Sequence, residues 1–117
     1  MGLKPRSLSG IKPTGKPHIG NYLGMIKPAL KLQENYQSFY FIADYHALTN
    51  FENSEKINEY IYDLTATFAA LNMDFKANAF FKQSDIPEVT ELSWILSCMT
   101  PKGLMERAHA FLSLIHI

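Results

Sequence analysis

The chain has little cysteine, no excess of charge of either sign and no long hydrophobic run. Its one cysteine, Cys98, excludes an internal disulfide and suits a reducing compartment. Eleven basic residues balance eleven acidic ones, so no large basic face for nucleic acid is visible. No stretch approaches about 18 consecutive apolar residues, and the N-terminus lacks the apolar segment of a secretion signal. These absences predict a cytoplasmic protein that does not span a membrane, and its 117 residues form one domain at most.

Glycine is also scarce, but its placement is informative. Five of the six glycines fall in the first 24 residues, and four of these lie between Ser9 and Gly24. Such a cluster lets the backbone turn tightly and lets a ligand approach it closely. A short strand at 7–9 comes before it, and an apolar run from Tyr22 follows it. The order of strand, glycine-rich turn and helix is typical of a site for nucleotide phosphates.

Two common phosphate loops do not fit this segment. Residues 10–16 match the first seven positions of G-x-x-x-x-G-K-[ST], but Pro17 stands where the hydroxyl should be. Pro13 also removes a backbone donor from the middle of the loop. The dinucleotide pattern G-x-G-x-x-G is absent. A loop that merely needs flexible turns therefore stays an alternative.

The remainder of the chain alternates apolar strands with amphipathic helices. Strands are expected at 7–9, 38–43 and 79–81. Between and after them, helices are expected at 21–34, from after Ser54 to 72–74, from Pro87 to Met99 and from near Gly103. Pro28 should break the first helix near Lys27. This order predicts an α/β fold with a parallel sheet and right-handed crossover helices. The apolar run at 94–99 predicts that Cys98 is a core residue and that Trp94 packs in a core or an interface.

Two polar segments follow neighbouring strands of the expected sheet. Ligands of such sheets bind beyond the carboxyl ends of the strands, where residues 10–21 and 44–46 would meet. A role for Asp44 and His46 in simply capping the sheet end stays open. His18, His46 and His109 offer no close pair at ligand spacing, so no metal site is predicted.

Three blocks of sequence resemble class I aminoacyl-tRNA synthetases. The run His18-Ile19-Gly20-Asn21 resembles the motif usually written HIGH, with asparagine in the last place. The wider run 9–24 is similar to bacterial-type tryptophanyl-tRNA synthetases, as are 41–49 and 102–111. The resemblance covers about residues 5–111. It implies that 1–111 are the N-terminal part of an incomplete, Rossmann-like catalytic domain, and that 112–117 are an atypical tail.

The resemblance implies a reaction and its participants. The parent enzyme would use ATP, with Mg²⁺, to activate tryptophan as an adenylate and would then transfer it to tRNA(Trp). It would be a homodimer, and it would bind tRNA through parts mostly absent from this chain. A piece of a tyrosyl-tRNA synthetase, or a nucleotide-binding module without ligase activity, are the alternatives.

The resemblance also implies individual roles. The residues expected to contact ATP are Lys12, Pro13, Thr14, His18, Gly20 and Asn21, with His18 and Asn21 acting in catalysis. The residues expected to line the tryptophan pocket are Gly10, Ala43, Asp44 and His46. His18 would donate to a phosphate oxygen from either ring nitrogen, depending on its tautomer. Many family members carry glutamine where this chain has Lys12.

Some parts of the family pattern do not occur in the chain. The lysine-rich loop usually written KMSKS is absent, and so are the acidic residue that reads the indole N–H and the helical domain that recognises the anticodon. We therefore expect a truncated chain that lacks the complete reaction. Surfaces that the missing parts would cover should be exposed.

Overall fold

The computed structural model describes residues 4–49 and 56–107. These fall into two compact units, the first ending at Gln83 and the second beginning at Ser84. The two units are described separately below.

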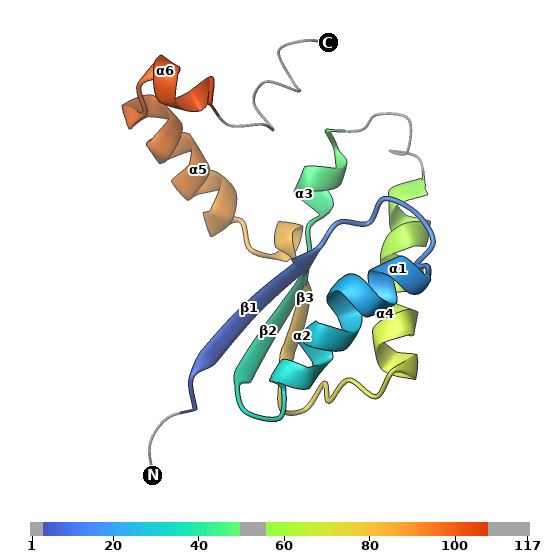
Figure 1. Ribbon diagram of the computed structural model, residues 1–117. Helices are drawn as coiled ribbons and strands as arrows, with labels where there is room; N and C mark the ends of the chain where they lie inside the picture. The colour runs from blue at the N-terminus through green and yellow to red at the C-terminus, as the bar shows by residue number, and fades with distance from the viewer. Residues whose placement is uncertain (1–3, 50–55, 108–117) are drawn as a thin grey trace. The chain divides into compact units, whose positions relative to one another are not determined.

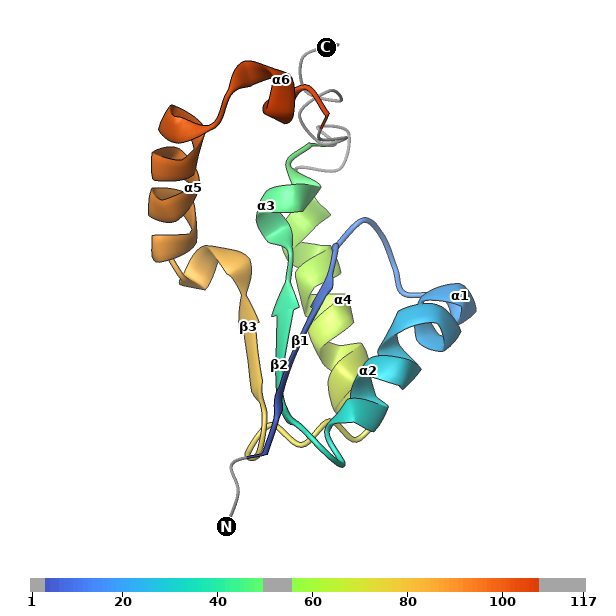
Figure 2. The ribbon, with the colours of Figure 1, turned by 60° about the vertical axis from the view of Figure 1, so that its left-hand side comes forward.

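The first unit is built on a parallel sheet, as predicted (Figure 1). Its strands are β1 (Arg6–Ile11), β2 (Gln37–Ile42) and β3 (Ala79–Lys82), which lie in the order β1-β2-β3. In register, Tyr40 pairs with Ser9 on one side and Phe80 on the other. Figure 2 shows the helices α2 (Lys27–Leu32) and α4 (Ile57–Ala70) on the same face of the sheet. The alternation of strands and helices expected from the sequence is confirmed.

The core lies between this face and the two helices. Its buried members are Ile26, Ala29, Tyr40, Phe68 and Met73. The Tyr40 hydroxyl donates to the Ala29 carbonyl oxygen at 2.9 Å, which satisfies the phenol where water cannot reach it. The Phe68 ring is fully buried, 5.9 Å from the Tyr40 ring and 5.2 Å from that of Phe80. Strand β2 is thereby fixed to both helices.

The helix that follows the glycine-rich loop differs from the expectation at Pro28. It consists of α1 (Ile19–Asn21), a π-helical stretch η1 (Tyr22–Ile26) and then α2. Lys27, where a break was expected, has helical angles (φ −60°, ψ −48°), and its N–H donates to the Tyr22 carbonyl. A proline cannot supply the usual α-helical bond, and the chain accommodates it by widening the preceding turn. The helix changes type at the predicted place but does not stop there.

Helix α4 ends where the sequence predicted. Asn72 has a left-handed backbone (φ 61°), the only positive φ among the described non-glycine residues. Its N–H donates to the Ala69 carbonyl, and the Met73 N–H donates to the Phe68 carbonyl. These two bonds satisfy carbonyls that a helix end leaves unpaired. The expected N-cap, Ser54, lies outside the described residues.

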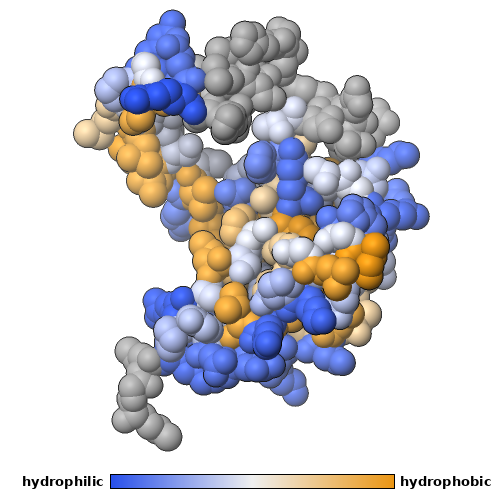
Figure 3. Space-filling model, in the orientation of Figure 1, coloured by the Kyte–Doolittle hydropathy of each residue, from blue (hydrophilic) through white to orange (hydrophobic). Residues whose placement is uncertain are grey.

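The second unit consists mainly of α5 (Glu88–Met99) and the short α6 (Lys102–Met105), and the turn η3 (Gln83–Asp85) leads into it. Pro87 caps α5, and Thr100 ends it, as predicted. Every residue of α5 is exposed, and Figure 3 shows the apolar surface over this helix. The prediction that Cys98 is a core residue is wrong, since its side chain is exposed, and Trp94 is 73% exposed. Among the described residues of its unit, the only other α-helix is the one-turn α6, which is too little to bury α5. No helix in 4–49 or 56–107 is long and apolar enough to cross a bilayer.

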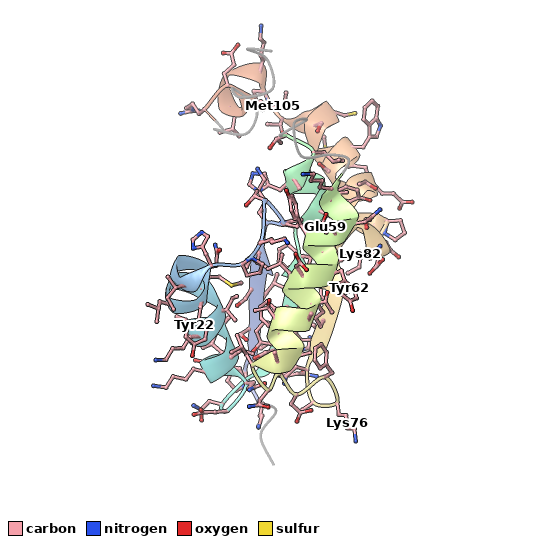
Figure 4. All side chains as sticks on the ribbon, turned by 90° about the vertical axis from the view of Figure 1, so that its right-hand side faces the viewer. Tyr22, Glu59, Tyr62, Lys76, Lys82 and Met105 are labelled. Atoms are coloured by element: carbon pink, nitrogen blue, oxygen red, sulfur yellow. The ribbon has the colours of Figure 1, made fainter. Side chains whose placement is uncertain are left out.

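Figure 4 shows the outer side of α4. Glu59 and Tyr62 are labelled there, and the Tyr62 side chain is 74% exposed. On its other side, α4 buries Leu64 and Phe68. This division is the amphipathic pattern expected of a helix that covers one face of a sheet.

Candidate active site

The segments that follow β1 and β2 lie side by side at the carboxyl edge of the sheet. The Ala43 N–H, just beyond β2, donates to the Ile11 carbonyl at the end of β1, at 2.8 Å. The glycine-rich loop leaves β1 here, and the short helix α3 (Asp44–Ala47) starts here. The two polar segments singled out in the sequence therefore meet at one edge, as the parallel topology requires.

His18 and Asn21 hold each other in place at the start of the helical run. His18 is the N-cap of α1, and its ring Nδ1 accepts the Gly20 N–H at 3.1 Å. In return, the His18 N–H donates to Asn21 Oδ1 at 3.0 Å. This reciprocal arrangement is a capping box, here formed by histidine and asparagine.

The capping box determines which atoms face outward. Because Nδ1 of His18 accepts a backbone hydrogen, the proton of the neutral ring resides on Nε2. Because Asn21 Oδ1 accepts from the backbone, the amide nitrogen Nδ2 remains as the donor. The sequence left the histidine tautomer open, and the structure favours Nε2–H. The two residues thus present two donors.

A residue larger than glycine at position 20 would have to displace the His18 ring. A Cβ at this position would lie 2.9 Å from Cε1 and 3.0 Å from Nδ1 of His18. The sequence predicted that Gly20 contacts ATP, and the structure adds that the absence of a Cβ here leaves room for the His18 ring. Gly24, one turn further on, has open space around it.

Four of the expected ATP contacts line one small hollow of about 120 Å³. They are Lys12, Thr14, His18 and Asn21, joined by Ile11, Gly15, Lys16, Pro17 and Leu64. The lining has two lysines and a histidine but no carboxylate, so it suits an anion. Its volume suits a phosphate group but is well below the roughly 300 Å³ of a typical site for a whole small molecule. The Pro13 side chain is fully buried and does not line the hollow.

Lys12 connects this hollow to the end of α3. Its Nζ donates to the Thr49 hydroxyl oxygen at 3.2 Å, and that hydroxyl donates to the His46 carbonyl at 2.8 Å. The sequence reasoning gave Thr49 no role, although it belongs to the block at 41–49. Its spacing of three residues from His46, typical of a hydroxyl that bonds back to the preceding turn, was the available signal.

The expected tryptophan contacts lie around the same edge. Gly10 is close to the end of β1, and a Cβ there would overlap the Phe41 ring on the next strand. Asp44 is buried, and its Oδ1 accepts the Tyr45 N–H at 3.1 Å. His46 is exposed, and Ala43 is half-buried. Gly10 lines a different hollow from the one at His18, with Ser9 and residues of the first helical run.

Known proteins resemble this chain in sequence and in fold. A profile of the family described as tRNA synthetases class I (W and Y) matches residues 3–114. The chain belongs to this family. A tryptophan–tRNA ligase from Fusobacterium nucleatum is 48% identical over 106 residues, which are 91% of this chain and 33% of that protein. The chain spans between a quarter and a third of the length of the curated relatives that it matches.

Solved structures of synthetases have the same fold. The crystal structure of tryptophanyl-tRNA synthetase from Campylobacter jejuni complexed with ADP and tryptophan superposes with a TM-score of 0.80 and 41% identity. That match covers 93% of this chain and 39% of the other. A tyrosyl-tRNA synthetase from Archaeoglobus fulgidus, complexed with L-tyrosine, has a TM-score of 0.74 at 24% identity over 91% of this chain and 35% of its own. This last likeness shows the fold alone.

For a class I synthetase, a much larger hollow than the one at His18 lies at the wrong end of the sheet. It has a volume of about 710 Å³ and is lined by Lys4, Arg6, Gln33, Tyr36, Gln37, Ala77 and Asn78. These residues lie at the amino ends of the strands, whereas ligands of parallel sheets bind at the carboxyl ends. We therefore assign the site by its chemistry and not by cavity size.

The part of the chain that the structure describes holds no group of three or more His, Cys, Asp or Glu side chains that could bind a metal ion. His109, considered as a ligand above, lies outside the described residues.

Proposed function

We propose that residues 1–111 are the N-terminal part of the catalytic domain of a tryptophan–tRNA ligase. The whole enzyme would activate tryptophan with ATP and transfer it to tRNA(Trp). The names of the curated relatives support this proposal, and so does the ADP and tryptophan complex of the Campylobacter jejuni enzyme. The atypical tail at 112–117 lies outside the described residues and has no part in the proposal.

The capping box of His18 and Asn21 is the observation that carries the proposal. It leaves His18 Nε2–H and Asn21 Nδ2 as donors beside a hollow that Lys12 also lines. Donors whose orientation is fixed before the ligand arrives stabilise developing negative charge without reorganising. An anion of phosphate size is the ligand that this set fits.

The reaction needs charge stabilisation more than covalent participation by the protein. A carboxylate oxygen of tryptophan attacks the α-phosphorus of ATP and forms a new P–O bond. The bond from that phosphorus to the bridging oxygen breaks, and pyrophosphate leaves with the electron pair. We assign His18 and Asn21 to the phosphate oxygens that gain charge, with Lys12 and Thr14 as further donors. Holding both reactants at this edge supplies the orientation that the reaction requires.

Gly20 and Pro13 act indirectly in this proposal. Gly20 provides space for the His18 ring. The buried Pro13 restricts the backbone of the loop between Lys12 and Thr14. Mg²⁺ would arrive bound to the phosphates of ATP, since the described residues offer it no ligand cluster of their own.

The tryptophan side of the site would use Gly10, Ala43, Asp44 and His46. These residues surround the junction of β1 and β2, next to the hollow. The tRNA would bind mainly through regions that this chain does not contain. We further propose a cytoplasmic location and a homodimeric parent enzyme.

The test is tryptophan-dependent exchange between ATP and pyrophosphate. It compares this chain alone with a chimera in which residues 1–111 replace the matching part of the Fusobacterium nucleatum ligase. We expect the chimera to catalyse exchange with tryptophan and not with tyrosine. The chain alone should bind ATP but should not catalyse exchange, because half of the site is absent.

Two controls separate the alternatives. The change His18→Ala in the chimera should reduce exchange by about 100-fold, as expected for the loss of a donor to developing charge. Exchange with tyrosine instead would assign the chain to a tyrosyl enzyme. ATP binding by the chain together with an inactive chimera would favour a nucleotide-binding module without ligase activity.

A further inference from the structure

We infer that Thr49 is a positioning residue, which holds the Lys12 ammonium at the junction of the ATP and tryptophan subsites. The inference rests on the proposed function and deepens it. Neither the family resemblance nor the relatives' names give Thr49 this role. It follows from the two hydrogen bonds that meet at the Thr49 hydroxyl.

The direction of both bonds is fixed by chemistry. A carbonyl oxygen can only accept, so the Thr49 proton points to the His46 carbonyl, 2.8 Å away. An ammonium can only donate, so Lys12 Nζ donates to a lone pair of the same hydroxyl oxygen, 3.2 Å away. The Thr49 hydroxyl therefore links the backbone of α3 to the side chain of Lys12, which lies 37 residues earlier in the sequence.

This link restricts a flexible side chain. A lysine has four rotatable bonds and loses rotamer entropy when its side chain is ordered. Lys12 is half-buried and lines the hollow beside His18, while α3 carries two of the expected tryptophan contacts. Its ammonium has three donors, of which Thr49 takes one. The others are available to the tryptophan carboxylate and the α-phosphate, two anions that must approach each other.

The inference predicts that Thr49 acts only through Lys12, and a double-mutant cycle tests this. The 117-residue chain is titrated with ATP and, separately, with adenosine, which lacks the phosphates. The variants are Thr49→Val, which keeps the shape but removes the hydroxyl, the conservative Thr49→Ser, Lys12→Met, and the double variant Lys12→Met/Thr49→Val.

We expect Thr49→Val to lower the affinity for ATP by about three- to tenfold, because a hydrogen bond to a charged group is lost. Thr49→Ser should restore it, and the affinity for adenosine should not change. In the Lys12→Met background, Thr49→Val should have less than about a twofold effect, since the coupled partner is already absent.

Other results of these titrations would contradict either the role of Thr49 or the proposed function. Equal effects of Thr49→Val in both backgrounds, or a parallel loss of adenosine affinity, would show that the hydroxyl merely caps α3 and would overturn the inference. No effect of Thr49→Val on ATP affinity would overturn it as well. A failure of the unchanged chain to bind ATP at all would contradict the proposed function, and the inference with it.

Discussion

At the scale of single residues, the site depends on groups whose orientation the backbone fixes. His18 and Asn21 each use one polar atom for a backbone hydrogen bond and present the other outward. The resemblance named both residues as ATP contacts, and the structure brings them together in one capping box. It could not give the tautomer, because that depends on the Gly20 N–H, whose position follows from the fold and not from residue type. Thr49 escaped notice for the same reason, since its link to Lys12 is a tertiary contact.

The role of Gly20 can be tested against a matched glycine on the same helical run. Gly20→Ala would press a methyl group against the His18 ring, whereas Gly24→Ala meets nothing within 4 Å. We expect Gly20→Ala to lower the affinity for ATP by about three- to tenfold through loss of the His18 cap. Gly24→Ala should leave the affinity unchanged. Isothermal titration of the full chain measures both, and equal effects would mean that the His18 ring does not depend on Gly20.

At the scale of elements, the sequence located the three strands, the C-terminal end of α4 and both ends of α5 to within a few residues. These features follow from local causes: β-branched and aromatic runs, helical spacing of apolar residues, and the residues that stop helices. The response to Pro28 was not local. A proline can break a helix or be accommodated by a π-turn, and packing decides between the two. Ile26 and Ala29, on either side of Pro28, are both buried, so a continuous helix keeps both in the core.

The end of α4 gives a quantitative test, because Asn72 adopts a left-handed backbone. Asn72→Ala should destabilise the chain by about 1 kcal/mol, since alanine lacks the short polar side chain that lets asparagine tolerate this conformation through local hydrogen bonds. Asn72→Gly should be neutral or slightly stabilising. At the exposed Ala66, within the helix, Ala→Gly should instead cost about 1 kcal/mol. Urea unfolding measures all three, and a loss of stability in Asn72→Gly equal to that in Asn72→Ala would contradict the assignment of the helix end.

At the scale of the whole molecule, the described core belongs to the first unit alone. The fully buried large side chains are all in residues 13–68, and α5 and α6 contain no buried residue. On the sheet face away from α2 and α4, Leu8 is 69% exposed. The sequence predicted that a partial synthetase domain would expose apolar surface. It placed Cys98 wrongly, because apolar spacing shows which face of a helix is suited to packing and not whether a partner element is present.

This distribution predicts that the first unit determines the stability of the chain. A chain that ends at Pro87 keeps all strands and the turn η3 but loses α5 and α6. Its free energy of unfolding should stay within about 0.5 kcal/mol of that of the full chain, since neither α5 nor α6 contains a buried residue. Phe68→Ala, which empties a fully buried site, should cost about 3–5 kcal/mol in both lengths alike. Urea unfolding followed by circular dichroism gives the four values. A clear loss of stability on shortening would contradict the prediction. A cost of Phe68→Ala that differed between the two chain lengths would also contradict it, because the removed residues would then affect the stability of the core around Phe68.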